Sequence, residues 1–333
     1  MRIKRIALPS PDGPQARIVV AAAGQSDYTD VRRHFQASLR RRHATLAAAH
    51  ELARLAVPGS LAAALGGGEV FLDALHAAAQ DTSGEFTAPA GQALMPLDPA
   101  AYRDFLSFEA HIVNAARLTA GQVDRAVYEI PISYMGSAQA FIEPGSEMPW
   151  PSYAQSKMDY ELELGIVTSR GGRNILPPEA DAHILGYTVL NDFSARDIQF
   201  REMRGRLGPS KGKHFASACG PLIVTPDELD PHDLKMTACV NGELWSEGHS
   251  STLMWRVQEL VAWASASEPL IAGTLLGTGT VGLGCGLELG RELRPGDLVE
   301  LDIQGIGTLS HRIGYPDGQG WAPTPRQPTL TTV

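Results

Sequence analysis

The sequence contains few cysteines, and their spacing excludes two kinds of architecture. Cys219, Cys239 and Cys285 are the only three, and none belongs to a Cys-x-x-Cys pair. A disulfide framework needs an even set of cysteines, and a thiolate zinc site needs paired ones, so neither is expected. The scarcity of cysteine fits a reducing compartment, and we expect a cytoplasmic protein.

Long apolar runs and a surplus of positive charge are also absent. No stretch approaches the roughly 20 apolar residues of a membrane span, and the start, MRIKRIALPSPDG, has no apolar run after its basic residues. The 28 Lys and Arg face 37 Asp and Glu, for a net charge of -9. Such a chain does not attract polyanions, so we expect a soluble protein with no nucleic-acid or membrane partner.

A phosphate-binding loop is missing too, although glycine is abundant. The run AGTLLGTGTVGLGCGLELG, residues 272–290, has glycine at nearly every second or third position but no GxxxxGK[ST] motif. Its glycines permit close approach of a ligand to the backbone. Thr280 and Glu288 are candidate site contacts there, and tight loop packing is the alternative.

What is present indicates a globular protein with a substantial core, because 44% of its 333 residues are hydrophobic. Residues 2–8 and 16–22 predict two strands joined at Pro-Asp-Gly-Pro, and residues 35–57 and 70–80 have helical periodicity. The stretch 81–98 is polar, lacks periodicity and is the predicted boundary. We therefore predict a small N-terminal α+β domain over residues 1–98.

The remainder, residues 99–333, has the pattern of a β-rich domain. Short apolar runs are separated by glycine and proline, as in ELELGIV, HILGYTVL, GPLIVTP and DLVELDI. Helices are predicted over residues 102–118, 194–204 and 253–266. The whole chain is thus predicted to be an α+β protein dominated by strands.

One of these strands, DYELELGIV at residues 159–167, carries three acids that alternate with apolar residues. Side chains two apart share one face of a strand, so the acids repel one another and require a cationic partner. Glu161 and Glu163 lie about 6.6 Å apart along an ideal strand and could share one ion, whereas Asp159 is roughly 13 Å from Glu163. We therefore assign Asp159 to an ion pair with Lys157 or an arginine; a solvated strand face is the alternative.

Other acidic and basic residues are weaker candidates by themselves. Asp104 and His111 are seven apart, which would place them on one face of the predicted helix, and Asp192 follows a buried strand. Capping and turn formation explain such residues equally well. The basic segment RDIQFREMRGRLGPSKGKHF could meet an anionic substrate, although a solvated helix face is the favoured explanation. The abundance of carboxylates and the lack of a thiolate cluster favour magnesium, manganese or calcium over zinc.

Several motifs, in order along residues 102–314, resemble the fumarylacetoacetate hydrolase family. They are RDFxxFExH, DxExEL, NDFSARDIQ, LGPxxGKxF, GTGTVG and LxPGDxVELxIxGIG. The resemblance implies a C-terminal catalytic domain built as a mixed β-sandwich or β-roll. It also implies a homodimer and a small anionic keto acid as substrate.

Carried over by position, the resemblance implies a role for ten residues. Asp104, Glu161, Glu163 and Asp192 would ligate a divalent metal, Mg²⁺ with Mn²⁺ or Ca²⁺ as alternatives. His111 would be the general base that activates water, and Glu288 would orient it. Lys213 and Gln199 would meet the substrate and its oxyanion, Tyr134 would contact substrate, and Thr280 would bind a carboxylate. Leu106 and Met203 stand where the animal enzymes carry tyrosines, which argues against fumarylacetoacetate itself as the substrate.

The implied reaction is hydrolysis of a C–C bond in a 1,3-diketo or acylpyruvate-like acid, with the metal stabilising the enolate that leaves. Decarboxylation of a 2-oxo acid, or keto–enol isomerisation of a dicarboxylate, could use the same site. Because only hydrolysis needs an activated water, His111 with Glu288 favours it. A catalytically idle metal-stabilised protein is a third interpretation, which the presence of base and oxyanion residues disfavours.

Overall fold

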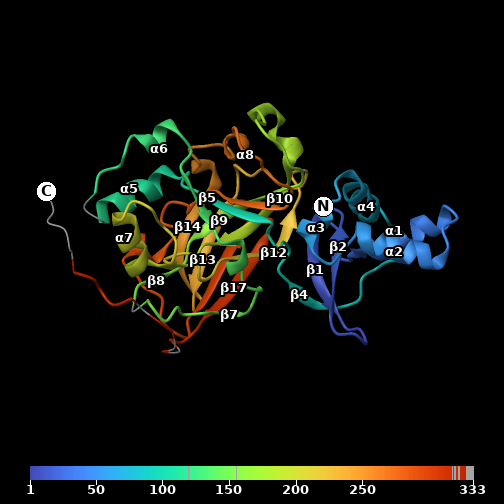
Figure 1. Cartoon of the computed structure of the whole chain (residues 1–333), viewed down its shortest axis with the longest axis horizontal. Helices are drawn as coiled ribbons and strands as arrows, with labels where there is room; N and C mark the ends of the chain where they lie inside the picture. Colours follow the sequence, from blue (N-terminus) through green and yellow to red (C-terminus); the bar gives the residue numbers. More distant parts are fainter. Residues whose placement is uncertain (119–120, 155, 317, 319, 322, 328–333) are drawn as a thin grey trace.

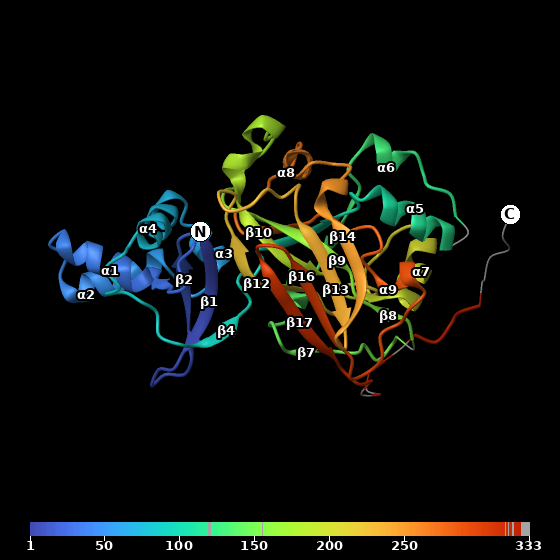
Figure 2. The same ribbon diagram turned by 180° about the vertical axis from the view of Figure 1, so that it is seen from behind.

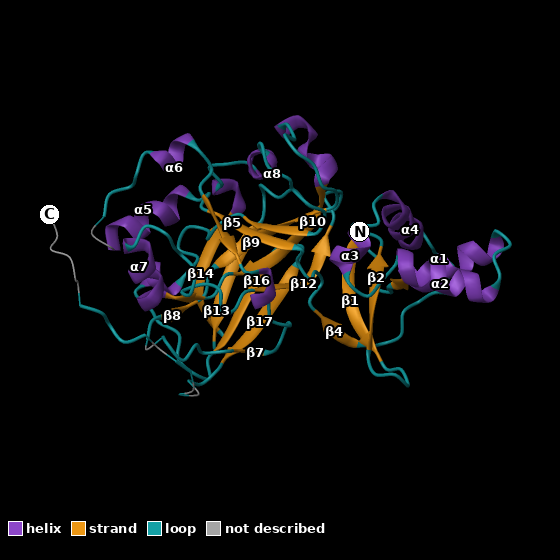
Figure 3. Ribbon diagram, in the orientation of Figure 1, coloured by secondary structure: helices purple, strands orange, loops and turns teal. Residues whose placement is uncertain are grey.

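The computed structural model describes residues 1–118, 121–154, 156–316, 318, 320–321 and 323–327. Residues 328–333, the end of the predicted catalytic domain, lie outside this description. Figures 1 and 3 show a strand-rich body with α5, α6 and α7 at one end, α1, α2 and α4 at the other, and α8 over the middle. The first hundred residues form β1 (Arg2–Leu8), β2 (Gln15–Ala21), β3 (Thr29–Asp30), α1 (Val31–Arg41), α2 (Leu46–Ala56), α3 (Leu61–Leu65), α4 (Glu69–Ala79) and β4 (Gln92–Leu94).

The remaining elements are short strands and helices. In chain order they are β5 (Ala101–Phe105), α5 (Glu109–Leu118), α6 (Ala126–Glu129), β6 (Ser133–Gly136), η1 (Ala138–Ala140), β7 (Glu147–Met148), β8 (Met158–Asp159), β9 (Leu162–Thr168), η2 (Pro177–His183), β10 (Ile184–Asn191), β11 (Ser194–Ala195), α7 (Arg196–Arg204), β12 (Ala218–Val224), β13 (Lys235–Val240), β14 (Glu243–His249), η3 (Ser250–Thr252), α8 (Val257–Ser265), β15 (Thr274–Gly277), α9 (Gly286–Leu289), β16 (Leu298–Ile303) and β17 (Gly307–Ile313).

Two sheets form the body of the protein. The larger has the order β3-β2-β1-β12-β10-β9-β15-β5-β6 with β4 beside β1, and the smaller has the order β14-β13-β16-β17-β7. Figure 2 shows β13, β14, β16 and β17 side by side. Strand β17 contacts β10 and β12 of the larger sheet. One apolar core joins the two sheets, so the predicted β-rich α+β fold is confirmed.

Strands β9 and β10 lie at the centre because their sequences allow burial on both faces. Every residue of both strands is buried, and they pair in antiparallel register from Asn191 opposite Leu162 onward. Continuous apolar runs are typical of strands covered on both sides. The position of the acids at and near the ends of these two strands determines where the functional site forms.

The N-terminal residues extend the larger sheet. The predicted hairpin is confirmed by β1 and β2, and β1 also pairs with β12, with Arg2 opposite Val224. Helices α1 and α2 begin where Asp30 and Thr45 accept backbone N–H groups of the first turn. A second core joins α3 and α4 to residues of β10, β12 and β15. Residues 1–98 thus share a sheet and a core with the rest, and the boundary at residue 98 remains a prediction.

The helix predicted over residues 102–118 is wrong in its first part. Residues 101–105 form β5, which pairs in parallel with β15, and the helix begins only at Glu109. Asp104 therefore lies on a strand and does not share a helical face with His111. Likewise the helix predicted over residues 194–204 begins only at Arg196, because Ser194 belongs to β11 and its hydroxyl donates to the Asp192 carbonyl. Among the described residues, no helix is both long and apolar enough to cross a membrane.

Candidate metal site and catalytic dyad

Three neighbouring strands bring Asp104 and Glu163 together. Strand β15 lies between β5 and β9, and its Gly277 is in register with Asp104 on one side and Gly165 on the other. A side chain at position 277 would collide with both carboxyls, because an ideal Cβ would overlap Asp104 Oδ1 and lie 2.8 Å from Glu163 Oε2. The missing side chain of Gly277 leaves the space in which these two acids meet.

Two further acids complete a carboxyl cluster. Asp104, Glu161 and Asp192 each place one oxygen within 4.8 Å of the others. Asp192 follows β10 directly. Glu161 lies in the break between β8 and β9, where its backbone forms an isolated antiparallel β-bridge with Cys285. Glu163 adjoins this group through Asp104 and accepts hydrogen bonds from the Gly279 amide at 3.2 Å and the Thr280 hydroxyl at 3.3 Å. All four side chains are buried.

Neighbouring side chains compensate the negative charge of the carboxyl cluster only in part. Asp104 Oδ1 is buried and has no hydrogen-bond partner among the residues that the structure describes. Burial, and then the charge of Asp192, raise the pKa of Asp104; burial, and then Asp104 itself, raise the pKa of Glu163. Both shifts mean that negative charge at these positions is poorly compensated.

Lys213 supplies a positive charge to part of the cluster. Its ammonium lies 2.5 Å from Glu161 Oε2 and 2.7 Å from Asp192 Oδ2. Burial opposes ionisation of Glu161, but Lys213 and then Arg196 outweigh it and lower the pKa of Glu161 to about 2. Lys213 is itself 3% exposed, so this is a fully buried ion pair.

Arg196, the first residue of α7, is a cationic partner of the kind that the three alternating acids require. Its guanidinium binds Asp159 Oδ2 at 2.6 and 2.9 Å and Glu161 Oε1 at 2.7 Å. The Asp159 carboxylate also accepts hydrogen bonds from the amides of Gly286 and Leu287, at 2.7 and 3.0 Å. Asp159 is thus paired with an arginine, as one of the two alternatives predicted, and ties α9 to the carboxyl cluster.

His111 and Glu288 form a hydrogen-bonded dyad beside the cluster. His111 Nδ1 lies 2.8 Å from Glu288 Oε2, and the other oxygen of Glu288 accepts from Asn114 Nδ2 at 2.9 Å and the Leu283 amide at 3.0 Å. Burial is the largest single influence and raises the pKa of Glu288, but the hydrogen bond and charge of His111 and the hydrogen bonds from Asn114 and the Leu283 amide together outweigh it, so the net pKa is lowered. Glu288 is therefore held ionised and oriented toward the imidazole.

The three remaining predicted residues also lie in this region. The Tyr134 hydroxyl donates to Asp192 Oδ2 at 2.6 Å, and Gln199 Oε1 accepts from Arg196 at 3.0 Å. Thr280 contacts Glu163, as described above. These contacts are with other side chains, and the substrate roles of the three residues remain predictions. Met203, which stands where the animal enzymes carry a tyrosine, lies on α7 and is 51% exposed.

Sequence reasoning did not select three residues that the structure joins to the site. Arg196 was one of several basic residues in its segment, and its neighbours on α7 are not buried. Ser217 donates to Asp192 Oδ1 at 3.2 Å, and Asn114 lies one turn after His111 on α5. The helical spacing of His111 and Asn114 was the one local signal that could have been used.

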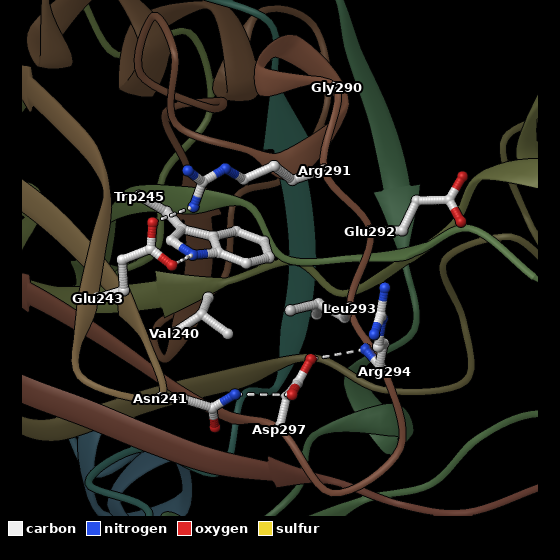
Figure 4. Close-up of a pocket in the computed structure, with 10 residues that line it drawn as sticks. All are labelled: Val240, Asn241, Glu243, Trp245, Gly290, Arg291, Glu292, Leu293, Arg294 and Asp297. Atoms are coloured by element: carbon white, nitrogen blue, oxygen red, sulfur yellow. Dashed lines mark hydrogen bonds and ion pairs between the residues drawn. The ribbon is translucent and has the colours of Figure 1, made fainter.

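A cavity of about 630 Å³ lies apart from these residues, at one end of the smaller sheet (Figure 4). There the Arg291 guanidinium lies 4.8 Å above the Trp245 ring and binds Glu243 at 2.8 Å. None of the ten predicted site residues lines this cavity. The predicted site residues therefore lie in the buried clusters and not in this cavity.

The residues of the carboxyl cluster fit a hard divalent cation. All four offer oxygen atoms, and Asp104 Oδ1 is buried without a partner within the described part of the chain. Burial and then neighbouring negative charge raise the pKa values of two of the four carboxyls. Oxygen-only donor sets of this kind suit Mg²⁺, Mn²⁺ or Ca²⁺. Asp104, Glu161, Asp192 and Glu163 are the residues that would hold such an ion.

The fold and site define a class: a two-sheet α+β protein with a buried carboxyl cluster beside a His–Glu dyad. The family described as fumarylacetoacetate (FAA) hydrolase C-terminal matches residues 100–314. This chain belongs to that family, as the motifs predicted.

Two relatives and two solved structures illustrate the range of the family. The chain is 34% identical over 187 residues to the mitochondrial oxaloacetate tautomerase FAHD2A of Homo sapiens and 37% identical over 163 residues to the oxaloacetate tautomerase YisK of Bacillus subtilis. The matches cover 55% and 48% of this chain and 59% and 53% of the relatives, so this chain spans about half the length of each relative.

The structural matches extend further along the chain. An HpcE protein from Mycobacterium smegmatis matches 94% of this chain and 99% of its own, with a TM-score of 0.71 and 26% identity. Fumarylpyruvate hydrolase from Pseudomonas aeruginosa, solved with Mn²⁺ and pyruvate, matches 68% of this chain and 92% of its own, with a TM-score of 0.56 and 28% identity.

Proposed function

We propose that this protein is a divalent-metal-dependent enzyme that acts on a small anionic 2-oxo acid, with His111 as its general base. The observation that carries the proposal is the juxtaposition of a buried carboxyl cluster suited to a cation with an imidazole oriented by Glu288. The Mn²⁺ and pyruvate bound to fumarylpyruvate hydrolase from Pseudomonas aeruginosa support both the kind of ion and the kind of substrate.

The dyad prepares His111 to accept a proton. When Nδ1 donates its hydrogen to the Glu288 carboxylate, the lone pair of the neutral ring lies on Nε2. The negative charge of Glu288 then stabilises the imidazolium that forms when Nε2 takes a proton, as the carboxylate does in a catalytic triad. Asn114 and the Leu283 amide keep Glu288 in place during this transfer.

The reaction that uses the most of this machinery is hydrolysis of a C–C bond in a 1,3-diketo or acylpyruvate-like acid. His111 would take a proton from water, and the resulting hydroxide would attack the carbonyl beside the bond that breaks. Lys213 and Gln199 would face the developing oxyanion. Asp104, Glu161, Glu163 and Asp192 would hold a divalent cation, which when bound would supply Lewis-acid stabilisation of negative charge on the 2-oxo acid. When the C–C bond breaks, its electron pair would leave as an enolate, and the His111 imidazolium would return its proton to the enolate carbon. The products would be a carboxylic acid and a 2-oxo acid.

Keto–enol tautomerisation of a 2-oxo dicarboxylate is the second candidate. The similarity to FAHD2A and YisK, both oxaloacetate tautomerases, favours it. In this reaction His111 would remove a proton from the carbon beside the carbonyl and return it to the oxygen, and no water would be consumed. Decarboxylation of a 2-oxo acid needs neither an activated water nor removal of a proton from carbon, so the His111–Glu288 dyad favours it least.

The experiment that separates these reactions is a substrate panel. Purified protein with Mg²⁺ is incubated with acylpyruvates, fumarylpyruvate, fumarylacetoacetate and oxaloacetate, and the products are identified by mass while enol content is followed by ultraviolet absorption. Two acid products from a diketo acid support hydrolysis, and faster loss of the oxaloacetate enol without a change in mass supports tautomerisation. Release of carbon dioxide alone would overturn both.

The expected homodimer and cytoplasmic location remain predictions. Light scattering during size-exclusion chromatography tests the first, with a mass near twice 35.6 kDa expected.

A further inference from the structure

A thiol lies in contact with the dyad and has no part in the proposed reaction. Cys285 Sγ lies 3.4 Å from Glu288 Oε2, the same oxygen that binds His111 Nδ1 at 2.8 Å. His111, Cys285 and Glu288 each place one possible ligand atom within 4.8 Å of the others. The Cys285 residue is 0% exposed, and the side chains of Glu288 and His111 are 0% and 9% exposed. The nitrogen, sulfur and oxygen donors thus converge inside the protein.

Two of the spacings between these donors can be compared with those of tetrahedral zinc. With Zn–S near 2.3 Å and Zn–N and Zn–O near 2.0 to 2.1 Å, tetrahedral angles place sulfur and oxygen about 3.5 Å apart, and nitrogen and oxygen about 3.3 Å apart. The observed Sγ to Oε2 distance of 3.4 Å already agrees, and the Nδ1 to Oε2 distance of 2.8 Å must open by about 0.5 Å. The distance would increase because the metal ion that replaces the proton between Nδ1 and Oε2 is larger than that proton.

The backbone holds the three donors in this arrangement. Cys285 bridges to Glu161 in antiparallel register, and the amide of Leu283 binds Glu288 at 3.0 Å. Asn114 fixes the far oxygen of Glu288, and α9 is fixed by Asp159 through the amides of Gly286 and Leu287. A preorganised set of donors loses little freedom when an ion binds.

We propose that His111, Cys285 and Glu288 form an inhibitory site for zinc, or another divalent ion that binds thiolate, separate in its donor chemistry from the carboxyl cluster. Binding would form bonds from the metal to Nδ1, Sγ and a Glu288 oxygen. It would release the thiol proton and shift the imidazole hydrogen from Nδ1, where Glu288 Oε2 accepts it, to Nε2, and it requires no oxidant or reductant.

The inhibition follows from the tautomer of the imidazole. A neutral ring whose Nδ1 lone pair binds a metal must carry its hydrogen on Nε2. Nε2 then cannot accept a proton, and the base of the proposed reaction is lost. This consequence rests on the proposed function, whereas the binding of the metal does not. The scarcity of cysteine in the sequence excluded a site with paired thiolates but not this mixed site with one.

The binding test uses Co²⁺ as the probe, in the presence of excess Mg²⁺ to occupy the carboxyl cluster. Mg²⁺ does not compete for thiolate, and cobalt bound to thiolate gives a charge-transfer absorption in the near ultraviolet. We expect one cobalt with this absorption per wild-type chain and none for Cys285→Ser or Cys285→Ala. The matched control is Cys239→Ser, on β13, which should keep the signal. Absence of the absorption in wild type, or its persistence in the Cys285 variants, would overturn the site.

The inhibition test uses Zn²⁺ and the substrate that the panel identifies. Loss of an outer-shell partner of a metal site already weakens binding about 10- to 100-fold, so loss of the thiolate ligand should raise the half-inhibitory zinc concentration by more than about 100-fold. Cys239→Ser should leave that concentration unchanged. A cobalt–thiolate signal together with undiminished turnover in zinc would uphold the site, but it would refute both its inhibitory effect and the role of His111 as base.

Discussion

Replacement of Lys213 by methionine tests whether its ammonium neutralises the buried carboxyls. Lys213 is 3% exposed and binds both Glu161 and Asp192. Met has a similar length without the charge, so Lys213→Met leaves two buried acids with one fewer partner. We expect a less stable protein when no divalent ion is present.

The expected magnitude follows from the contacts that remain. Removing one partner of a buried ion pair costs about 3 to 5 kcal/mol. Glu161 would keep Arg196, and Asp192 would keep its hydrogen bonds from Tyr134 and Ser217. We therefore expect a loss near the lower end, about 3 kcal/mol in the free energy of unfolding. Mg²⁺ at about 100 times its dissociation constant would return about 2.7 kcal/mol.

The assay is urea unfolding followed by tryptophan fluorescence, with chelator and then with Mg²⁺. The matched control is Lys235→Met, because Lys235 pairs with Glu247 at 2.7 Å but the two side chains are 54% and 56% exposed. An exposed pair contributes about 0 to 1 kcal/mol. If Lys213→Met costs no more than this control in chelator, the account of the cluster as uncompensated buried charge is refuted.

Three further predictions concern other parts of the structure. Gly277→Ala should abolish stabilisation by Mg²⁺ in thermal unfolding, since its Cβ would overlap Asp104 Oδ1; an unchanged response would contradict the placement of the ion. Asn114→Leu should lower kcat about tenfold, because a hydrogen bond to a charged group is worth about 1.5 kcal/mol, and unaltered steady-state kinetics would exclude a positioning role. Burial lowers the pKa of His311 from 6.5 to about 4, so its neutral form contributes stability above pH 6.5 that is lost as the pH falls toward 4. His311→Phe should therefore remove up to about 3 kcal/mol of acid sensitivity in urea unfolding, and an identical pH profile would refute this.

Local sequence predicted the elements that local interactions determine. The hairpin of β1 and β2 follows from its turn residues, and the alternation in DYELEL required a cation. The helix predicted over residues 35–57 exists as α1 and α2, separated where His43 adopts a φ of 67° and Thr45 caps the second helix. Such a break between two helices involves only a few residues, and hydrophobic periodicity does not reveal it.

Distant pairing accounts for what the sequence could not predict. Strand β5 forms because residues 274–277, far along the chain, lie beside it, and this pairing overrides the helical pattern of residues 102–118. Arg196 is distinguished from its basic neighbours only by tertiary contacts with Asp159 and Glu161. The four acids of the cluster were taken from motifs, because their spacing in the chain does not reveal that they converge.

The central claim is that His111, held by Glu288 beside a divalent cation, moves the proton in the reaction. The most direct measurement compares turnover and Mg²⁺ affinity of wild type and His111→Ala on the substrate that the panel identifies. General base catalysis contributes about 10²- to 10⁴-fold, so kcat should fall by at least about 100-fold while the Mg²⁺ dissociation constant, from calorimetry, stays unchanged. Turnover near that of wild type in the variant would contradict the account.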